Sequence, residues 1–185
     1  ALLYRMCKFD KEHNHIVISL MDEQKYGPLL NEIGVVVHTL SFPKGKIKFS
    51  GFFKLYRLIK QIKPDVVQTW LDHADMIGGI VARLAGIKNI VWGVHHTALV
   101  KGESKLSTIF ISKINVFLSY FIPKKIIYCA EESKKAQEKI GYKKAKGVVV
   151  LNGYDIEGFT QNDSLSAEIR NDLSINVNSF LIGHV

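Results

Sequence analysis

The chain has 185 residues, of which 47% are hydrophobic and 10% aromatic; this composition excludes a disordered protein and suits one ordinary domain, or one domain plus part of another. Lys and Arg number 25 against 17 Asp and Glu, so the net charge of +8 favours anionic partners: nucleotides, sugar phosphates, lipid headgroups or nucleic acid. Cys7 and Cys129 lie far apart without metal-ligand spacing, which favours a reducing, cytosolic compartment.

Expected strands and helices alternate along the sequence. In chain order we expect a helix over 2–11, a strand over 16–20, a helix over 26–33, a strand over 35–40, an amphipathic helix over 52–63, a strand over 65–69, a helix over 74–84, a strand over 87–94, a helix over 104–122, a strand over 125–129, a helix over 131–140, a strand over 146–151 and a helix over 164–174. This alternation predicts an α/β fold: a Rossmann-like parallel sheet with helices on both faces.

Basic residues are concentrated between 44 and 63. They suit either a solvated helix face or contact with anionic lipid headgroups, with nearby Phe side chains entering the interface. Nucleic acid is the less favoured partner, because no recognised binding module is present. The residues assigned to this surface are Lys44, Lys46, Lys48, Lys54 and Arg57, followed by Lys60 and Lys63.

Polar and aromatic residues follow two consecutive strands of the central βαβ unit. Trp70 and Asp72 come after the strand at 65–69, and His95, His96 and Thr97 come after the strand at 87–94. Ligands of open α/β sheets bind outside the carboxyl ends of the strands, so these two loops form the candidate site. Two adjacent His side chains usually point apart, and we expect at most one to face a ligand.

Several of these residues also have ordinary structural interpretations. Asp72 or Asp75 can cap the helix that follows, and either His can be satisfied by a backbone carbonyl. Gly78 and Gly79 cost about 1 kcal/mol each inside a helix, which predicts close packing on a neighbouring backbone.

Two further segments carry weaker signals. The helix at 104–122 is apolar nearly all round but is interrupted by Lys113 and Asn115, so we expect a buried or interface-lying helix and no membrane span. Asn152 and Gly153 follow the strand at 146–151 and form a turn signal, and Ser164 is the expected N-cap of the last helix.

The order of these segments supports a resemblance. PDVVQTW, an Ala/Gly-rich helix, KNIVWGVHHT, KKIIYCAEESKK and KGVVVLNGYDIEGF together resemble the N-terminal half of a family-4 retaining glycosyltransferase with two Rossmann domains (the GT-B fold). The run at 152–159 is similar to the family's N-G-[IV]-D-x-x-x-F segment, with Tyr154 at the usual aliphatic position.

The resemblance implies transfer of a hexosyl group, with retention and without a metal ion, from a nucleotide-sugar donor to a glycan or lipid-linked acceptor in surface polysaccharide synthesis. It implies that His96 hydrogen-bonds the transferring sugar. The acceptor or sugar would contact Trp70, Asp72, His95, Thr97 and Asn152. The expected location is cytoplasmic, at the inner face of the cell membrane.

The resemblance also implies a domain organisation. Residues 1–160 would be the acceptor-binding domain, lacking its first strand and Gly-rich loop, and 161–185 would be a linker helix with the first strand of the donor-binding domain. We expect a fragment that is inactive alone. Two alternatives stay open: a sugar-nucleotide 2-epimerase of the same fold, and a non-catalytic module that binds a carbohydrate or a nucleotide.

Overall fold

The computed structural model describes residues 2–43, 49–95, 106–154, 162–176 and 179–180. Its elements in chain order are α1 (Leu2–Phe9), β1 (Ile16–Ser19), α2 (Tyr26–Glu32), β2 (Val36–Thr39), α3 (Phe49–Ile62), β3 (Val67–Trp70), α4 (Asp72–Leu84), β4 (Ile90–Val94), α5 (Leu106–Leu118), β5 (Lys125–Tyr128), α6 (Glu131–Lys139), the 3-10 helix η1 (Lys144–Lys146), β6 (Gly147–Val149) and α7 (Asp163–Asp172). The chain divides into two compact units, 1–152 and 153–185.

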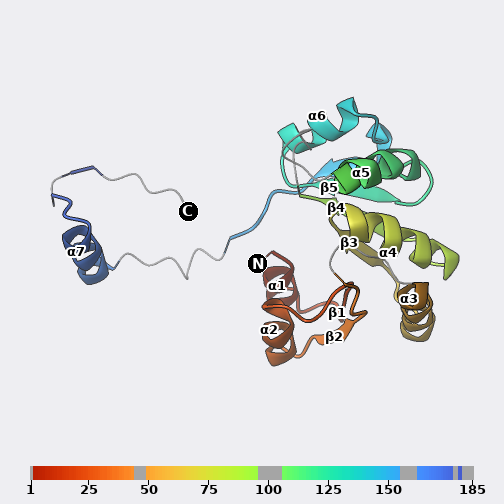
Figure 1. Cartoon of the computed structure of the whole chain (residues 1–185), viewed down its shortest axis with the longest axis horizontal. Coiled ribbons are helices and arrows are strands. Elements are labelled where there is room, and N and C mark those ends of the chain that lie inside the picture. The colour runs from red at the N-terminus through yellow and green to blue at the C-terminus, as the bar shows by residue number, and fades with distance from the viewer. Residues whose placement is uncertain (1, 44–48, 96–105, 155–161, 177–178, 181–185) are drawn as a thin grey trace. The chain divides into compact units, whose positions relative to one another are not determined.

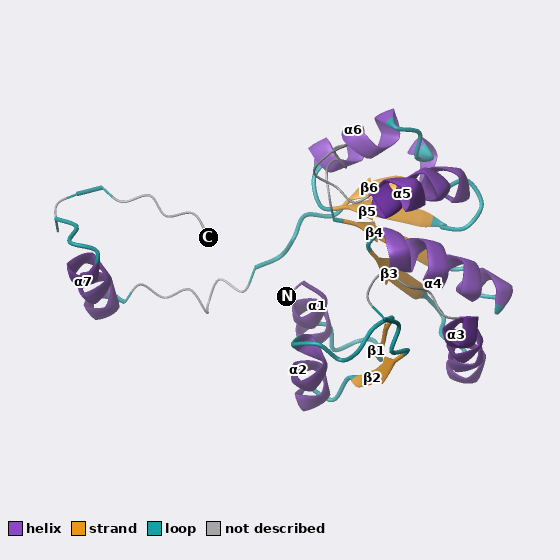
Figure 2. Cartoon of the chain, in the orientation of Figure 1, coloured by secondary structure: helices purple, strands orange, loops and turns teal. Residues whose placement is uncertain are grey.

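Every strand pairing in the described residues is parallel, so the predicted α/β fold is confirmed (Figure 2). The strands form two sheets, one with the order β1-β2 and one with the order β3-β4-β5-β6. The edge of β1 away from β2 and the edge of β3 away from β4 carry no strand among the described residues. Successive strands of the four-stranded sheet are joined by α4, α5 and α6, as expected for βαβ crossovers.

Helices cover both faces of the first strand pair. Figure 1 shows β1 and β2 between α1 and α2 on one side and α3 on the other. Correspondingly there are two hydrophobic clusters: a small one around Cys7, Leu30 and Val35, and a large one that includes Leu55, Trp92 and the side chains they pack against on α4 and β3–β5. The larger cluster supports the strands whose ends form the candidate site.

Several element ends differ from the sequence-based expectation. The prediction that Ser164 caps the last helix was wrong: Asn162 is the N-cap, because its Oδ1 accepts a hydrogen bond from the Leu165 N–H at 3.0 Å. Helix α4 begins at Asp72, two residues earlier than expected, and Leu71 is its N-cap residue. Gly34 follows α2 with a φ of 82°, the left-handed conformation in which glycine commonly ends a helix.

The two glycines of α4 contact side chains, so the expected packing on a backbone was wrong. A Cβ on Gly79 would lie 2.9 Å from both the Trp92 Nε1 and an Ile122 methyl, and a Cβ on Gly78 would lie 3.0 Å from the Thr69 methyl. Both glycines therefore let α4 approach the sheet and the end of the α5 segment closely, which offsets their poor helix propensity.

Candidate functional site

The carboxyl ends of β3 and β4 bring two aromatic rings together. Trp70 is the last residue of β3 and pairs in register with Gly93 of β4, two residues before His95. The indole of Trp70 and the imidazole of His95 are stacked, with centroids 4.7 Å apart and planes 7° from parallel. Both side chains are partly exposed, so the stacked pair is accessible in part at the predicted edge of the sheet.

Gly93 makes this stacked arrangement possible. A Cβ at position 93 would lie 3.0 Å from the Thr69 carbonyl oxygen and 3.2 Å from the His95 Nε2. These separations are tighter than ordinary van der Waals contact, so a side chain at this position would push the imidazole away. The absence of a side chain at Gly93 therefore lets His95 fold back over the sheet.

Leu71 holds an unusual backbone conformation beside this stacked pair. Its φ is 73° and its ψ is 158°, a region that residues other than glycine adopt at a cost of about 1–3 kcal/mol. The Leu71 N–H donates to the Gly93 carbonyl at 3.2 Å, which ties the turn to β4, and the Leu71 side chain is exposed. Strain of this kind is concentrated at functional sites, so Leu71 marks this turn as a candidate.

Two carboxylates lie in the first turn of α4, and both are buried. Asp72 is 5% exposed, and its backbone carbonyl accepts a hydrogen bond from the Asn115 Nδ2 at 2.9 Å. Asp75 is fully buried and accepts from the Thr69 hydroxyl at 2.5 Å. Burial raises the pKa of Asp75 well above its usual range, and the nearby Asp72 raises it further, against the lowering effect of the Thr69 hydrogen bond. Asp75 thus belongs to the protein interior.

The remaining predicted site residues lie on other elements or outside the described part. Asn152 is exposed and follows β6, two strands away from β4 at the carboxyl edge of the same sheet. Lys54 and Arg57 are exposed on α3, where they border one shallow open pocket. The Lys54 Nζ donates to the Thr39 carbonyl at the end of β2 at 2.6 Å. His96, Thr97, Lys44, Lys46 and Lys48 lie outside the described residues.

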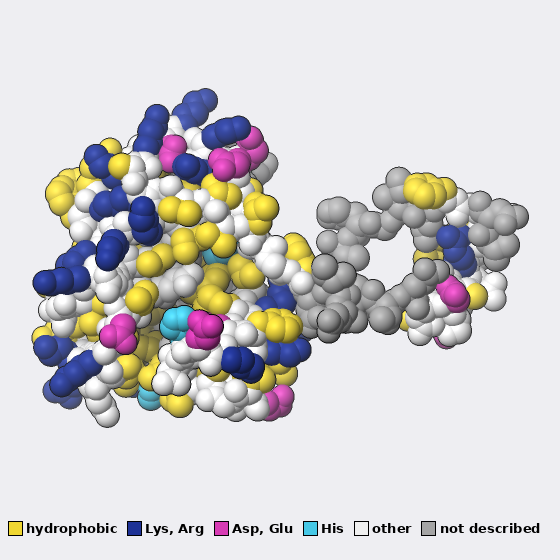
Figure 3. Space-filling view, turned by 180° about the vertical axis from the view of Figure 1, so that it is seen from behind, with side chains coloured by type: hydrophobic (Ala, Val, Ile, Leu, Met, Phe, Trp, Pro, Cys, Tyr) yellow, Lys and Arg dark blue, Asp and Glu magenta, His cyan; other side chains and the backbone are white. Residues whose placement is uncertain are grey.

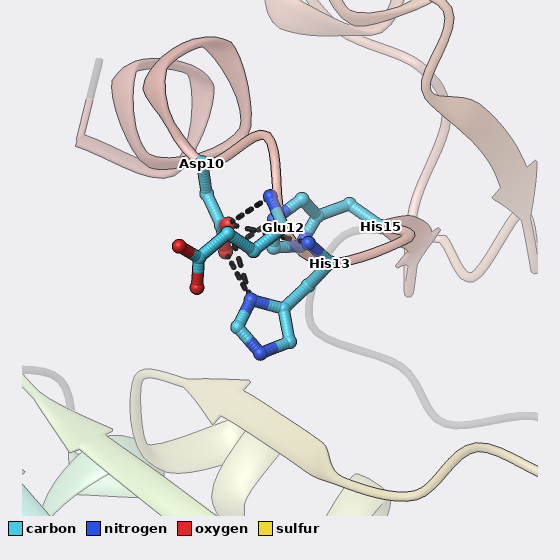
Figure 4. A network of polar contacts seen from close by, with 4 residues as sticks. All are labelled: Asp10, Glu12, His13 and His15. Carbon is cyan, nitrogen blue, oxygen red and sulfur yellow. Dashed lines mark hydrogen bonds and ion pairs between the residues drawn. The ribbon is translucent and has the colours of Figure 1, made fainter.

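A second polar cluster, formed by Asp10, His13 and His15, lies between α1 and β1 and was not predicted from the sequence. The Asp10 carboxylate lies between two imidazoles, with Oδ2 at 3.0 Å from both the His13 Nδ1 and the His15 Nε2 (Figure 4). The hydrogen bond from His13 lowers the pKa of Asp10 to about 2, and the Asp10 carboxylate raises the pKa of His13. The spacing D-x-x-H-x-H was the available signal. No group of three metal-binding side chains suited to an ion occurs in the described ranges.

On the face of the larger unit that Figure 3 shows, basic side chains are more common than acidic ones. Figure 3 shows Lys and Arg side chains along its edge, with hydrophobic side chains between them. Within the part of the chain that the structure describes, every helix is too short or too polar to cross a bilayer.

Comparisons with known proteins bear on this arrangement. A family model described as Glycosyltransferase Family 4 matches residues 7–157. The UDP-Gal:alpha-D-GlcNAc-diphosphoundecaprenol alpha-1,3-galactosyltransferase of Escherichia coli is 28% identical over 109 residues, which are 59% of this chain and 28% of that protein.

Solved structures show the same fold. The HepE protein of Anabaena, in complex with UDP-glucose, gives a TM-score of 0.67 at 20% identity over 86% of this chain and 42% of its own. The UDP-N-acetylglucosamine 2-epimerase of Rickettsia bellii gives 0.55 at 15% identity over 95% of this chain and 48% of its own. The chain thus spans less than half the length of each relative, and these likenesses confirm the Rossmann-like fold.

Proposed function

The chain belongs to glycosyltransferase family 4, and from this premise we propose that it is the acceptor-side part of an enzyme that transfers a sugar from a nucleotide-sugar donor. The donor class is supported by the relatives, since the E. coli enzyme carries UDP-Gal in its name and the Anabaena structure contains UDP-glucose. A lipid-linked glycan is the proposed acceptor, because the E. coli name specifies a diphosphoundecaprenol. The corresponding role is in surface polysaccharide synthesis.

The observation that carries this proposal is the stacked pair of Trp70 and His95 at the carboxyl ends of β3 and β4. The exposed part of the indole suits the C–H face of a sugar ring. In this arrangement His95 has a supporting role, since its imidazole is held against the indole. His96 follows His95 in the sequence, and we assign to it the hydrogen bond to the transferring sugar, with Thr97 as the next residue.

Asp72 and Asn152 have more limited roles in the proposed site. The Asp72 side chain is almost closed to solvent, so it contacts the acceptor only through its small exposed part while its carbonyl holds Asn115. Asn152 is exposed and follows β6, and we propose that it meets the sugar from that side.

The proposed reaction transfers a hexosyl group with retention of the anomeric configuration and needs no metal ion. Side chains of this unit would bind and orient the acceptor, and the nucleotide would be held by a downstream donor-binding half. Transfer that is unchanged in excess EDTA, with a product of the same anomeric configuration as the donor, is the expected result. Inversion, or loss of transfer restored by a divalent cation, would contradict this part of the proposal.

The two-sheet topology supports the proposed domain organisation. β1 and β3 each present one edge without a strand in the described part, and all their pairings are parallel. A parallel strand from upstream sequence, followed by its Gly-rich loop, would pair with both edges and give the strand order of a doubly wound sheet. We assign residues 1–160 to the acceptor-binding domain and 161–185 to the linker and the start of the donor-binding domain. The reading frame on both sides of the chain tests this assignment.

The protein is proposed to act at the cytoplasmic face of the membrane, where a lipid-linked acceptor is held. The basic surface of α3, with Lys54 and Arg57, suits anionic headgroups, and Lys44, Lys46 and Lys48 precede it in the sequence.

An epimerase of the same fold is the second candidate, supported by the likeness to the Rickettsia bellii enzyme; its TM-score is lower than that of the Anabaena protein. A non-catalytic binding module is the third.

Variants of the full-length protein separate these candidates. We expect His96→Ala to lower kcat/KM about a hundredfold, as for loss of a hydrogen bond made mainly in the transition state. Trp70→Ala should raise KM for the acceptor more than it lowers kcat. His13→Ala, far from β3 and β4 in the sequence, is the matched control and should leave transfer unchanged. Full activity of His96→Ala would refute the site assignment, and epimerised donor without acceptor would identify an epimerase.

A further inference from the structure

Helix α5 buries several polar residues and exposes aromatic ones. Ser112, Asn115 and, in the turn that follows, Ser119 are 4%, 0% and 0% exposed, beside the buried Ile111 at 8%. Its most exposed large hydrophobic side chains are Phe110 and Phe117, each 65% exposed. A helix packed on a globular core normally buries its apolar side and exposes its polar side.

The polar side is buried because it makes specific bonds to the rest of the unit. The Asn115 Nδ2 donates to the Asp72 carbonyl at 2.9 Å, and the Ser119 hydroxyl accepts from the Lys143 N–H at 3.1 Å. The end of the helix is held as well, since the Lys146 Nζ donates to the carbonyls of Ser119 and Tyr120. These contacts fix the rotation of α5, so its aromatic residues face outward as a consequence of stable packing.

The outward aromatic residues form a surface that we call the aromatic stripe. Phe110 and Phe117, seven positions apart, lie on one face of α5, and Tyr120 and Phe121 follow in the turn after the helix. The rings of Phe117 and Phe121 lie 5.3 Å apart, and those of Tyr120 and Phe121 lie 6.4 Å apart. Phe121 is 65% and Tyr120 47% exposed. The aromatic stripe consists of Phe110, Phe117, Tyr120 and Phe121.

The charged residues of the segment that carries the aromatic stripe are all basic. Residues 106–130 contain Lys113, Lys124 and Lys125 and no Asp or Glu. Lys113 lies on the exposed side of α5 between Phe110 and Phe117, and the Lys143 Nζ lies 5.0 Å from the centre of the Tyr120 ring. A surface that meets this region must therefore accept aromatic side chains and supply negative charge.

An anionic lipid bilayer has both properties. Exposed Phe and Tyr side chains enter the boundary between headgroups and acyl chains, and neighbouring lysines reach anionic headgroups. A second copy of the chain is a poorer fit, because a twofold contact through the aromatic stripe would bring Lys113 of each copy together. α5 also packs on α4, the helix that begins at the candidate site.

We propose that the aromatic stripe of α5 is a membrane-docking surface that inserts shallowly into an anionic bilayer. This inference deepens the membrane location in the proposed function and places the apolar part of the contact on α5 instead of α3. Docking through α5 would hold the first turn of α4, and with it the site, at a fixed height above a lipid-linked substrate.

The test is sedimentation of the chain with vesicles of phosphatidylcholine alone or mixed with phosphatidylglycerol. We expect binding to the mixed vesicles that weakens with salt, and a loss of affinity of at least about tenfold in the triple variant F110S/F117S/F121S. Lys113→Glu should weaken binding by at least about fivefold. The matched control is Phe53→Ser, which removes a 69% exposed Phe from α3 and should bind like the unmodified chain.

Several outcomes would overturn the proposal. These are absent binding to the mixed vesicles, equal binding of the triple variant and the unmodified chain, or loss of binding in Phe53→Ser alone. A concentration-dependent dimer that only the triple variant dissolves would show that a second copy covers the aromatic stripe. Lipid binding is measured without donor or acceptor, so failure here is distinct from failure of the proposed sugar transfer.

Discussion

Replacing Asp75 by Asn should remove a pH dependence from the stability of the larger unit. The carboxyl is fully buried, and burial raises its pKa well above the usual value of 3.8. The folded protein therefore keeps this proton at pH values where the unfolded chain has lost it, so the free energy of unfolding falls as the pH rises above about 4. One proton contributes up to about 1.4 kcal/mol per pH unit until the folded pKa is reached.

Asn keeps an oxygen that can accept from the Thr69 hydroxyl, which now lies 2.5 Å from the carboxylate of Asp75. The difference in unfolding free energy between Asp75→Asn and the unmodified chain should therefore grow with pH by up to about 1.4 kcal/mol per unit. Groups that titrate alike in both proteins cancel in this difference. Urea unfolding from pH 5 to pH 8, followed by the fluorescence of the buried Trp92, measures it.

Thr69→Val is the matched control, because it removes the same hydrogen bond and keeps the carboxyl. It should lower stability at every pH by about 1 kcal/mol and retain the downward slope with pH. The reasoning would be refuted if Asp75→Asn and the unmodified chain showed the same slope, since the buried carboxyl would then hold no extra proton in the folded state.

Three further changes have defined expectations. Gly51→Ala should destabilise the fold by about 1–2 kcal/mol despite the better helix propensity of Ala, because the new Cβ would overlap the buried ring of Phe42; thermal unfolding measures the loss. Asp10→Asn should lower the pKa of His13 towards its ordinary 6.5, as read from NMR shifts of the imidazole, and an unchanged pKa would contradict the ion pair in Figure 4. Leu71→Gly should raise the free energy of unfolding by about 1 kcal/mol, because glycine adopts a φ of 73° without backbone strain, and it should lower transfer by the full-length enzyme. A lower free energy of unfolding would argue against strain at Leu71.

The periodicity of the sequence was sufficient for the fold, and it also selected the edge at which we propose the site. Apolar runs and the turn residues between them gave the order of strands and helices, and the crevice rule selected the ends of β3 and β4. The stacking of Trp70 on His95 could not be predicted, because it depends on the register between the strands and on the space that Gly93 leaves.

Contacts between segments far apart in the sequence explain where the structure differs from the sequence-based prediction. Helix α4 begins at Asp72, earlier than expected, because the preceding Leu71 adopts a backbone conformation that sequence propensities do not predict for leucine. The orientation of α5 follows from the bond between Asn115 and the Asp72 carbonyl, 43 positions apart, while the helix itself is apolar on nearly all sides. Local pattern alone therefore identified α5 as a helix and left open which side of it is buried.

Sugar transfer by the full-length protein is the most direct test of the central claim. The protein would be incubated with radiolabelled UDP-hexoses and a lipid-linked glycan acceptor, and the product linkage read by NMR. We expect one UDP-hexose to be transferred with its anomeric configuration retained, and His96→Ala to abolish nearly all of this transfer. A donor epimerised in the absence of acceptor, or no transfer from any UDP-hexose, would contradict it.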